Sequence, residues 1–170
     1  MEQERYSVLF SSQTGNTKIL AQAIAQALPA ADCDYFGDYQ GRVPSSPVLF
    51  VGFWTDKGTA DAATLELLKT VKNKKIFLFG TAGFGGSAAY FQKILLRVQK
   101  NLDAGNQVIG TFMCQGKMPL SVRQRYEKMK EQPNPAPNLD MLIANFDRAL
   151  THPDEQDLQR LQEAVCAVQM

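Results

Sequence analysis

Four short runs of apolar residues, none alternating with polar residues, constrain the fold of this chain more than any other feature. They lie at residues 6–10, 48–52, 75–80 and 107–114. A strand with one face in water is apolar at every second position, whereas a strand buried on both faces is apolar throughout. The four runs are therefore expected to be strands of a parallel sheet whose two faces are both covered.

Segments with apolar residues at three- and four-residue spacing lie between and after these runs, as amphipathic helices require. The helices are expected at residues 16–28, 59–72, 87–102, 120–130, 139–150 and 154–168, with a turn at 131–138. Residues 32–37 are more polar and are expected to form a fifth strand near a sheet edge. This order predicts an α/β fold in which a doubly wound, five-stranded parallel sheet lies between two layers of helices.

Length and charge limit the classes of function. The chain has 170 residues, which suits one domain spanning residues 1–170, and its 18 basic and 17 acidic side chains give a net charge of +1. This balance favours neither nucleic acid nor an anionic membrane as a partner. The charged N-terminus and the absence of a long apolar run predict no signal peptide, no membrane span and a cytoplasmic location. Three widely spaced cysteines suggest buried, reduced thiols and neither a disulfide framework nor a metal site.

The junction between the first strand and the first helix is rich in small polar residues. It contains Ser12, Gln13, Thr14, Gly15, Asn16 and Thr17. A helix N-terminus carries unpaired N–H groups and partial positive charge, so with added hydroxyls it can hold a phosphate without a cation. The alternative is that Thr14 or Asn16 only caps the helix, which would leave the other polar residues unexplained. A nucleotide triphosphatase is disfavoured because the motif GxxxxGK[ST] is absent.

Two further loops follow buried strands and should meet the first at the carboxyl edge of the sheet. The loop "GFWTDKGTAD" contains the only tryptophan, Trp54, and Gly58 suggests a turn with positive φ. Trp54 is either a core residue or a platform for a flat ring. The loop "GTAGFGGSAAYF" places four glycines around Phe84, and it either forms an ordinary turn or passes closely over a planar ligand.

Together, these three loops resemble those of the flavodoxin family, and the resemblance extends over residues 5–168. It implies the strand order 2-1-3-4-5, an FMN phosphate site at residues 12–17, and two loops that flank the isoalloxazine ring. The expected FMN-binding residues are Ser12, Gln13, Thr14, Gly15, Asn16, Thr17, Phe53, Trp54, Thr55, Asp56, Lys57, Gly58, Thr81, Ala82, Gly83, Phe84 and Gly85. The insertion of long-chain flavodoxins is not expected, because the last strand runs directly into its loop.

The chain departs from the family pattern in two ways. Ala88 stands where many flavodoxins place the tyrosine that stacks on the outer flavin face, so Phe84, Trp54 or neither takes that place. Typical flavodoxins are also strongly acidic around the flavin, whereas this chain is nearly neutral and offers Lys57 and Lys117 there. A different redox partner is therefore expected, together with a less negative potential for the second reduction.

The resemblance favours an electron carrier that passes electrons from FMN to a partner reductase, with another reductase as donor. The alternative is an FMN-dependent oxidoreductase that acts directly on a quinone or a tetrapyrrole-type substrate. In either case the cofactor supplies the chemistry, so we expect no catalytic side chain and no metal. A receiver domain would need acidic residues where Ser11 and Ser12 stand, and a serine hydrolase would need the motif GxSxG.

Overall fold

The structure of the chain is a computed structural model that describes residues 4–85, 87–168 and 170. Its parallel sheet has the order β2-β1-β3-β5-β6, and a short strand, β4, pairs with β3 in the antiparallel sense. The strands are β1 (Tyr6–Phe10), β2 (Cys33–Asp38), β3 (Val48–Asp56), β4 (Thr59–Ala60), β5 (Lys75–Ala82) and β6 (Gln107–Gln115). The α-helices are α1 (Asn16–Ala27), α2 (Ala62–Thr70), α3 (Ala88–Gln99), α4 (Leu120–Lys130), α5 (Leu139–Ala149) and α6 (Glu155–Ala167), and a 3₁₀ turn covers Ala30–Asp32.

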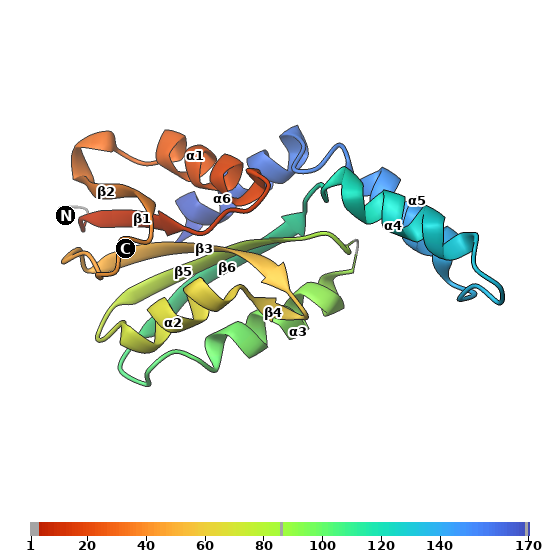
Figure 1. Cartoon of the computed structure of the whole chain (residues 1–170). Coiled ribbons are helices and arrows are strands. Elements are labelled where there is room, and N and C mark those ends of the chain that lie inside the picture. The colour runs from red at the N-terminus through yellow and green to blue at the C-terminus, as the bar shows by residue number, and fades with distance from the viewer. Residues whose placement is uncertain (1–3, 86, 169) are drawn as a thin grey trace.

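Helices cover both faces of the sheet (Figure 1). Helices α1 and α6 pack against one face and against each other, while α2 and α3 lie on the opposite face. The strand order equals the predicted 2-1-3-4-5 once β4 is set aside, and β2 lies at the predicted edge. The α/β fold and its strand order are therefore confirmed.

The strands have no alternating pattern because the sheet has two hydrophobic cores. Val8, Phe50 and Phe77 lie side by side in neighbouring strands and face α1 and α6. Leu9 and Val51, each the next residue in its strand, point to the core beneath α2 and α3. All five are at most 1% exposed, so each strand needs apolar residues at successive positions.

Strand β4 is the clearest departure from the expected elements. The helix expected from residue 59 begins at Ala62, because Thr59 and Ala60 fold back against Asp56 and Thr55 as a short hairpin. The apolar spacing that predicts the helix continues into these two residues, so periodicity alone does not separate them.

Helices α4 and α5 form an antiparallel pair that projects beyond the carboxyl ends of the parallel strands (Figure 1). The turn expected at residues 131–138 joins them. None of the helices in the described part of the chain combines the length and the apolar character needed to cross a bilayer.

The cysteines only partly follow the expectation of buried thiols. All three are free; Cys114 is buried, Cys33 is half-buried and Cys166 is exposed. Cys166 lies near the end of α6, where its thiol is 4.0 Å from the carbonyl of Ala27 at the end of α1. The prediction that it is buried is therefore wrong.

Candidate functional site

The loop between β1 and α1 presents unpaired backbone donors at the carboxyl edge of the sheet. Gly15 is the N-cap residue of α1, with a φ of 90°. Because glycine has no side chain, it cannot cap the helix by accepting a hydrogen bond. The hydroxyl of Ser12 accepts from the N–H groups of Gly15, at 3.1 Å, and Lys18, at 3.4 Å. For the N–H groups of Thr14 and Asn16, no acceptor occurs among the described residues. Such donors at a helix N-terminus suit an anion.

Asn16 contributes an orphaned acceptor to the same loop. Its side-chain Nδ2 donates to the carbonyl of Lys117 at 2.8 Å, and the residue is only 5% exposed. Its Oδ1 is buried and has no hydrogen-bond partner among the described residues. An acceptor left in this way costs about 1 to 3 kcal/mol. A phosphate dianion has no hydrogen to donate to Asn16 Oδ1, whereas the hydroxyl group of a sugar alcohol can donate one. The site therefore suits a ligand that carries both a phosphate and hydroxyl groups.

Two of the predicted site residues lie beneath the surface. Thr17 is 1% exposed, and its hydroxyl donates to the carbonyl of Phe53 at 3.1 Å and lies 3.4 Å from the hydroxyl of Thr81. The side chain of Phe53 is fully buried in the core beneath α2 and α3. These residues hold α1 against the ends of β3 and β5, and a direct contact with a cofactor remains a prediction for them.

The loop after β3 is a tight hairpin with strong local support. Lys57 and Gly58 have φ values of 53° and 84° and join β3 to β4 as a two-residue turn, which agrees with the positive φ expected at Gly58. The guanidinium of Arg97 donates to the carbonyl of Gly58 at 3.1 Å. The half-buried Trp54 lies in β3 just before this turn.

Asp61 stabilises the same hairpin through hydrogen bonds to Trp54 and Thr64, a role that the sequence analysis missed. Its carboxylate caps α2 by accepting from the N–H of Thr64 at 3.2 Å, and it also accepts from the Thr64 hydroxyl at 2.8 Å. The N–H of Trp54 donates to the same carboxylate at 3.3 Å, and the carbonyl of Trp54 accepts from the N–H of Asp61 at 3.0 Å. An aspartate directly before an amphipathic segment is the signal that could have identified this cap.

The glycine-rich loop after β5 is held by side chains from other parts of the chain. The carbonyl of Gly83 accepts from the amide groups of Gln115 and Asn145, each at 3.0 Å. Gln115 also donates to Asn145 Oδ1 at 3.1 Å. A Cβ atom on Gly83 would lie 2.6 Å from the side chain of Met118, so a larger residue here would require Met118 to move. Phe84 is 40% exposed, and Gly86, which was included in the sequence analysis of this loop, lies outside the described residues.

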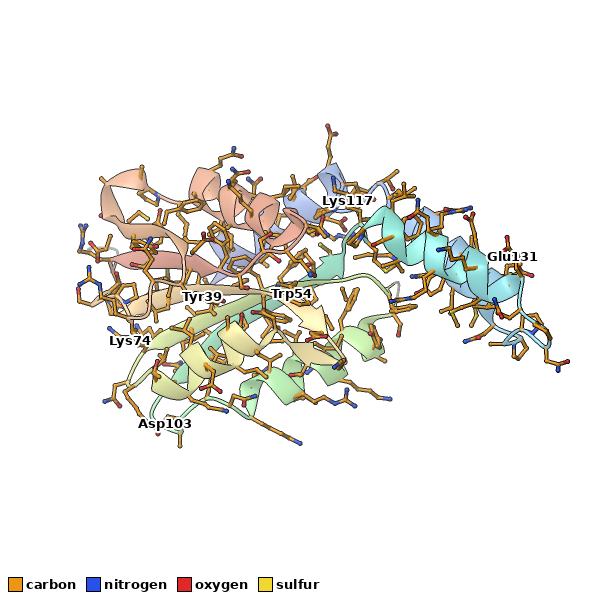
Figure 2. All side chains as sticks on the ribbon, in the orientation of Figure 1. Tyr39, Trp54, Lys74, Asp103, Lys117 and Glu131 are labelled. Carbon is orange, nitrogen blue, oxygen red and sulfur yellow. The ribbon has the colours of Figure 1, made fainter. Side chains whose placement is uncertain are left out.

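Two adjoining hollows lie between these loops. The smaller, of about 80 Å³, is lined by parts of all three loops and by residues 116–119. The larger, of about 340 Å³, lies between residues 55–58 and 82–84 and extends to Tyr90. They share Thr55, Ala82, Gly83 and Met118, so Met118 lies where the hollows meet. The position of Trp54 between the loops is visible in Figure 2.

The structure therefore brings most of the predicted residues together. Those that line the two hollows are Gln13, Thr14, Asn16, Trp54, Thr55, Lys57, Gly58, Thr81, Ala82, Gly83 and Phe84. Ser12 and Gly15 line a third hollow beside them, next to Phe36 and Asp38. Asp56 and Gly85 line none of these hollows. Lys117, expected near the flavin, lines the smaller hollow, while Gly116, Met118 and Pro119 are additions. Their position directly after the strand beside β5 could have identified them.

Two ionisable side chains near this edge are held in their neutral forms. The hydroxyl of Tyr39 donates to the carbonyl of Gly52 and contacts the hydroxyl of Thr64 at 3.0 Å. Burial raises the pKa of Tyr39 well above its usual range. Burial likewise raises the pKa of the Cys114 thiol, so that side chain is not a thiolate at neutral pH.

A sequence model of the flavodoxin domain matches residues 7–166. The chain belongs to the flavodoxin family. It is 36% identical to the flavodoxin-like domain-containing protein BilS of Clostridium symbiosum, over 93% of this chain and 92% of that protein. It is 31% identical to the protein of the same description from Clostridioides difficile, over 89% of this chain and 88% of that protein.

Solved flavodoxins share the fold. The oxidised Flavodoxin 2 of Bacillus cereus superposes with a TM-score of 0.59 and 14% identity, over 96% of both chains. A flavodoxin from the domain Archaea gives a TM-score of 0.54 and 13% identity, over 95% of this chain and 93% of that one. At these identities the similarity shows the fold alone.

The residues present fit FMN. The β1–α1 loop offers N–H donors for one phosphate, and the orphaned Asn16 Oδ1 suits a ribityl hydroxyl. The hollow of about 340 Å³ lies between two loops that carry aromatic side chains, Trp54 and Phe84. Family membership and this fit together support FMN binding by this flavodoxin. When bound, FMN would accept and release electrons through its isoalloxazine ring.

Proposed function

We propose that this chain is an FMN-binding electron carrier that takes electrons from a reductase and passes them to a partner enzyme. One observation carries the proposal: a donor-rich helix N-terminus and two aromatic-bearing loops from separate strands converge on adjoining hollows. The chain's own residues would bind and orient the cofactor, and the cofactor would carry the electrons. The free cysteines agree with a reducing compartment, and we propose the cytoplasm.

The residues proposed to contact FMN can be assigned by role. Thr14, Gly15 and Asn16 would surround the phosphate and ribityl chain, with Ser12 holding the loop through its hydrogen bonds to the backbone. Trp54 and Phe84 would lie against opposite parts of the ring system. Thr55 links their loops, because its hydroxyl donates to the carbonyl of Thr81 at 2.8 Å.

The first experiment identifies the cofactor and tests the loop. The purified chain should bind FMN more tightly than FAD, because the proposed phosphate site is a single loop and the sequence has no GxGxxG motif for a pyrophosphate. Each hydrogen bond to a charged group contributes about 1.5 to 3 kcal/mol, so Thr14→Val with Asn16→Ala should weaken FMN binding at least about tenfold. The matched control is Thr70→Val with Asn101→Ala, which removes similar groups from helix ends away from the loop. Tight FAD binding, or unchanged affinity in the first pair, would contradict the assignment.

The second experiment separates a carrier from an enzyme. The FMN-loaded chain alone should oxidise neither NADH nor NADPH, and it should carry electrons to cytochrome c when a flavoprotein reductase is added. Direct turnover of a quinone with NAD(P)H by the isolated chain would favour the oxidoreductase alternative and would overturn the carrier function.

A further inference from the structure

The hairpin formed by α4 and α5 is an excursion of the chain next to the candidate FMN site. Its two ends lie together, because the N–H of Lys117 donates to the carbonyl of His152 at 3.0 Å. Asn145 of α5 joins it to the glycine-rich loop through the carbonyl of Gly83. Lys117 lies at the base of the hairpin and Glu131 toward its outer end (Figure 2). A helix of 11 residues is about 16 Å long, so α4 reaches well beyond the site.

The packing of this hairpin leaves large apolar side chains in solvent. Tyr126 is the one buried residue of α4, and the ion pairs Arg123–Asp147 and Lys130–Asp140 join the helices. Exposed pairs of this kind contribute little to stability. Of the seven large apolar side chains that are exposed in the described residues, five belong to the hairpin or to the adjoining loop. They are Phe84 at 40%, Leu120 at 62%, Met129 at 41%, Met141 at 64% and Leu150 at 49%. These side chains are spread along both helices and the adjoining loop, and exposure of several large apolar side chains on one excursion of the chain is a feature of surfaces that bind other proteins.

The same region is basic although the whole chain is nearly neutral. Residues 117–150, which include both helices of the hairpin, hold six basic side chains and four acidic ones, against 18 and 17 in the complete sequence. Arg123 and Lys130 are neutralised by their partners on α5. For Lys117, Arg125 and Lys128, the described residues provide no ion pair. Glu131 and Arg148 are exposed and also form no ion pair with a described residue, so the hairpin keeps a net positive charge.

We infer that the α4–α5 hairpin, together with Phe84, is the docking surface for a redox partner protein whose own docking face is acidic. This inference rests on the proposed function. Apolar side chains set among cations suit a protein interface, which needs a desolvated apolar centre as well as complementary charge at its rim. A nucleic-acid partner would bind through its phosphates to cationic side chains, and it would not need the exposed methionines and leucines. The contacts of Asn145 and Gln115 with Gly83 hold the base of the hairpin against the glycine-rich loop of the candidate FMN site.

Stopped-flow reduction of two haem proteins tests the inference. The FMN-loaded chain is first reduced, and then mixed with the acidic ferric cytochrome b5 or with the basic ferric cytochrome c. In each encounter one electron leaves the reduced flavin and one ferric haem becomes ferrous. Arg125→Glu with Lys128→Glu should slow the reduction of cytochrome b5 at least about tenfold at low ionic strength and should not slow that of cytochrome c. Added salt should slow the wild-type reaction with cytochrome b5 and have little effect on the variant's.

A matched charge reversal provides the control. Arg42→Glu with Lys100→Glu changes the net charge equally at two exposed side chains that form no ion pair with a described residue, in the loop before β3 and at the C-terminal end of α3, away from the site. Equal slowing by both pairs would show that net charge alone matters and would overturn the inference, as would an unaffected rate in the hairpin variant. If the wild type formed dimers and the hairpin variant did not, the partner on this surface would be a second copy of the chain. That result would also overturn the inference. Arg125→Gln with Lys128→Gln repeats the test if the reversed pair does not fold.

The inference and the proposed function fail in different ways. A wild-type chain that does not bind FMN would refute the proposed function. A wild-type chain that binds FMN and reduces both cytochromes at rates unchanged by the hairpin variants would leave the carrier function in place and refute the docking surface. FMN affinity, measured separately by flavin fluorescence, should be the same within about twofold in the wild type and in the Arg125 and Lys128 variants.

Discussion

The two loops that flank the larger hollow are held in place by different means. The loop after β3 takes most of its support from its own neighbourhood, from the Lys57–Gly58 turn and from Asp61, seven residues from Trp54. Two longer-range hydrogen bonds add to it, from Arg97 to Gly58 and from Thr55 to Thr81. The glycine-rich loop is held by Gln115 and Asn145, which are 32 and 62 residues from Gly83. The first loop is thus part of the folding unit of β3 and α2, whereas the second depends on β6 and the hairpin being in place. Damage to the first should reduce stability, and damage to the second should reduce cofactor affinity.

Removing Asp61 should produce the largest effect. Asp61→Ala removes the cap of α2 and leaves the Thr64 hydroxyl and the Trp54 N–H without their acceptor, at a site that is 2% exposed. The free energy of unfolding should fall by about 2 to 4 kcal/mol. Urea denaturation followed by circular dichroism measures it.

Asp61→Asn supplies the comparison, because asparagine is also a good cap and keeps one acceptor oxygen. It should lose less than half as much stability as the alanine variant. If Asp61→Ala retained wild-type stability, the claim that Asp61 stabilises this loop would be wrong.

Removing Asn145 should have the next largest effect, on FMN binding. Asn145→Ala leaves Gly83 with one of its two amide donors and removes the acceptor for Gln115. If the less ordered loop weakens the free energy of FMN binding by about 1 to 2 kcal/mol, the FMN dissociation constant should rise roughly 5- to 30-fold. Quenching of flavin fluorescence during a titration measures it.

Asn101→Ala is the matched control, since Asn101 also donates to two backbone carbonyls, at the far end of α3. It should leave FMN affinity unchanged. An Asn145→Ala protein that lost as much stability as Asp61→Ala but kept its FMN affinity would erase the difference between the two loops.

The aromatic residues of the two loops should contribute less. Aromatic stacking is worth about 0.5 to 1.5 kcal/mol, so Phe84→Ala should weaken FMN binding about 2- to 12-fold. Trp54 fluorescence should be strongly quenched when FMN binds, because the half-buried indole lies beside the hollow. Leu96→Ala, which removes another exposed apolar side chain, is the control for Phe84. If FMN binding left the tryptophan emission bright and unchanged, Trp54 would not lie against the isoalloxazine ring.

The smallest effect concerns the charge on the turn. Lys57 is exposed, and it forms no ion pair with another described residue. Its attraction for the anion formed on reduction of FMN is therefore screened to about 0.2 to 1 kcal/mol. Lys57→Gln should make the one-electron potential of the second reduction more negative by about 10 to 40 mV, because tenfold corresponds to about 59 mV.

Lys100→Gln removes the same charge at the end of α3 and should leave the potential unchanged. A redox titration of the three proteins compares them. A potential that rises in Lys57→Gln would give the lysine no electrostatic role and leave Gly58 as the determinant of the turn.

Several features of this protein followed from local sequence pattern. Apolar runs without alternation predicted the buried parallel strands, because each strand faces a core on both sides. The concentration of hydroxyl, amide and glycine residues at residues 12–17 predicted a donor-rich helix N-terminus, and Gly58 predicted a turn with positive φ. In each case the physical cause acts within a few residues, so the pattern and its effect occupy the same stretch of chain.

Tertiary structure alone decided the rest of the site. Nothing near Gln115 or Asn145 in the sequence shows that their amides meet the carbonyl of Gly83, because an amide group can bond to any exposed donor or acceptor. The position of Met118 beside Gly83 and the orphaned oxygen of Asn16 likewise depend on where β6 ends relative to β5 and α1. These contacts arise between segments that pack only when the sheet has formed, so they are set by strand order and register, which no single stretch of the sequence encodes.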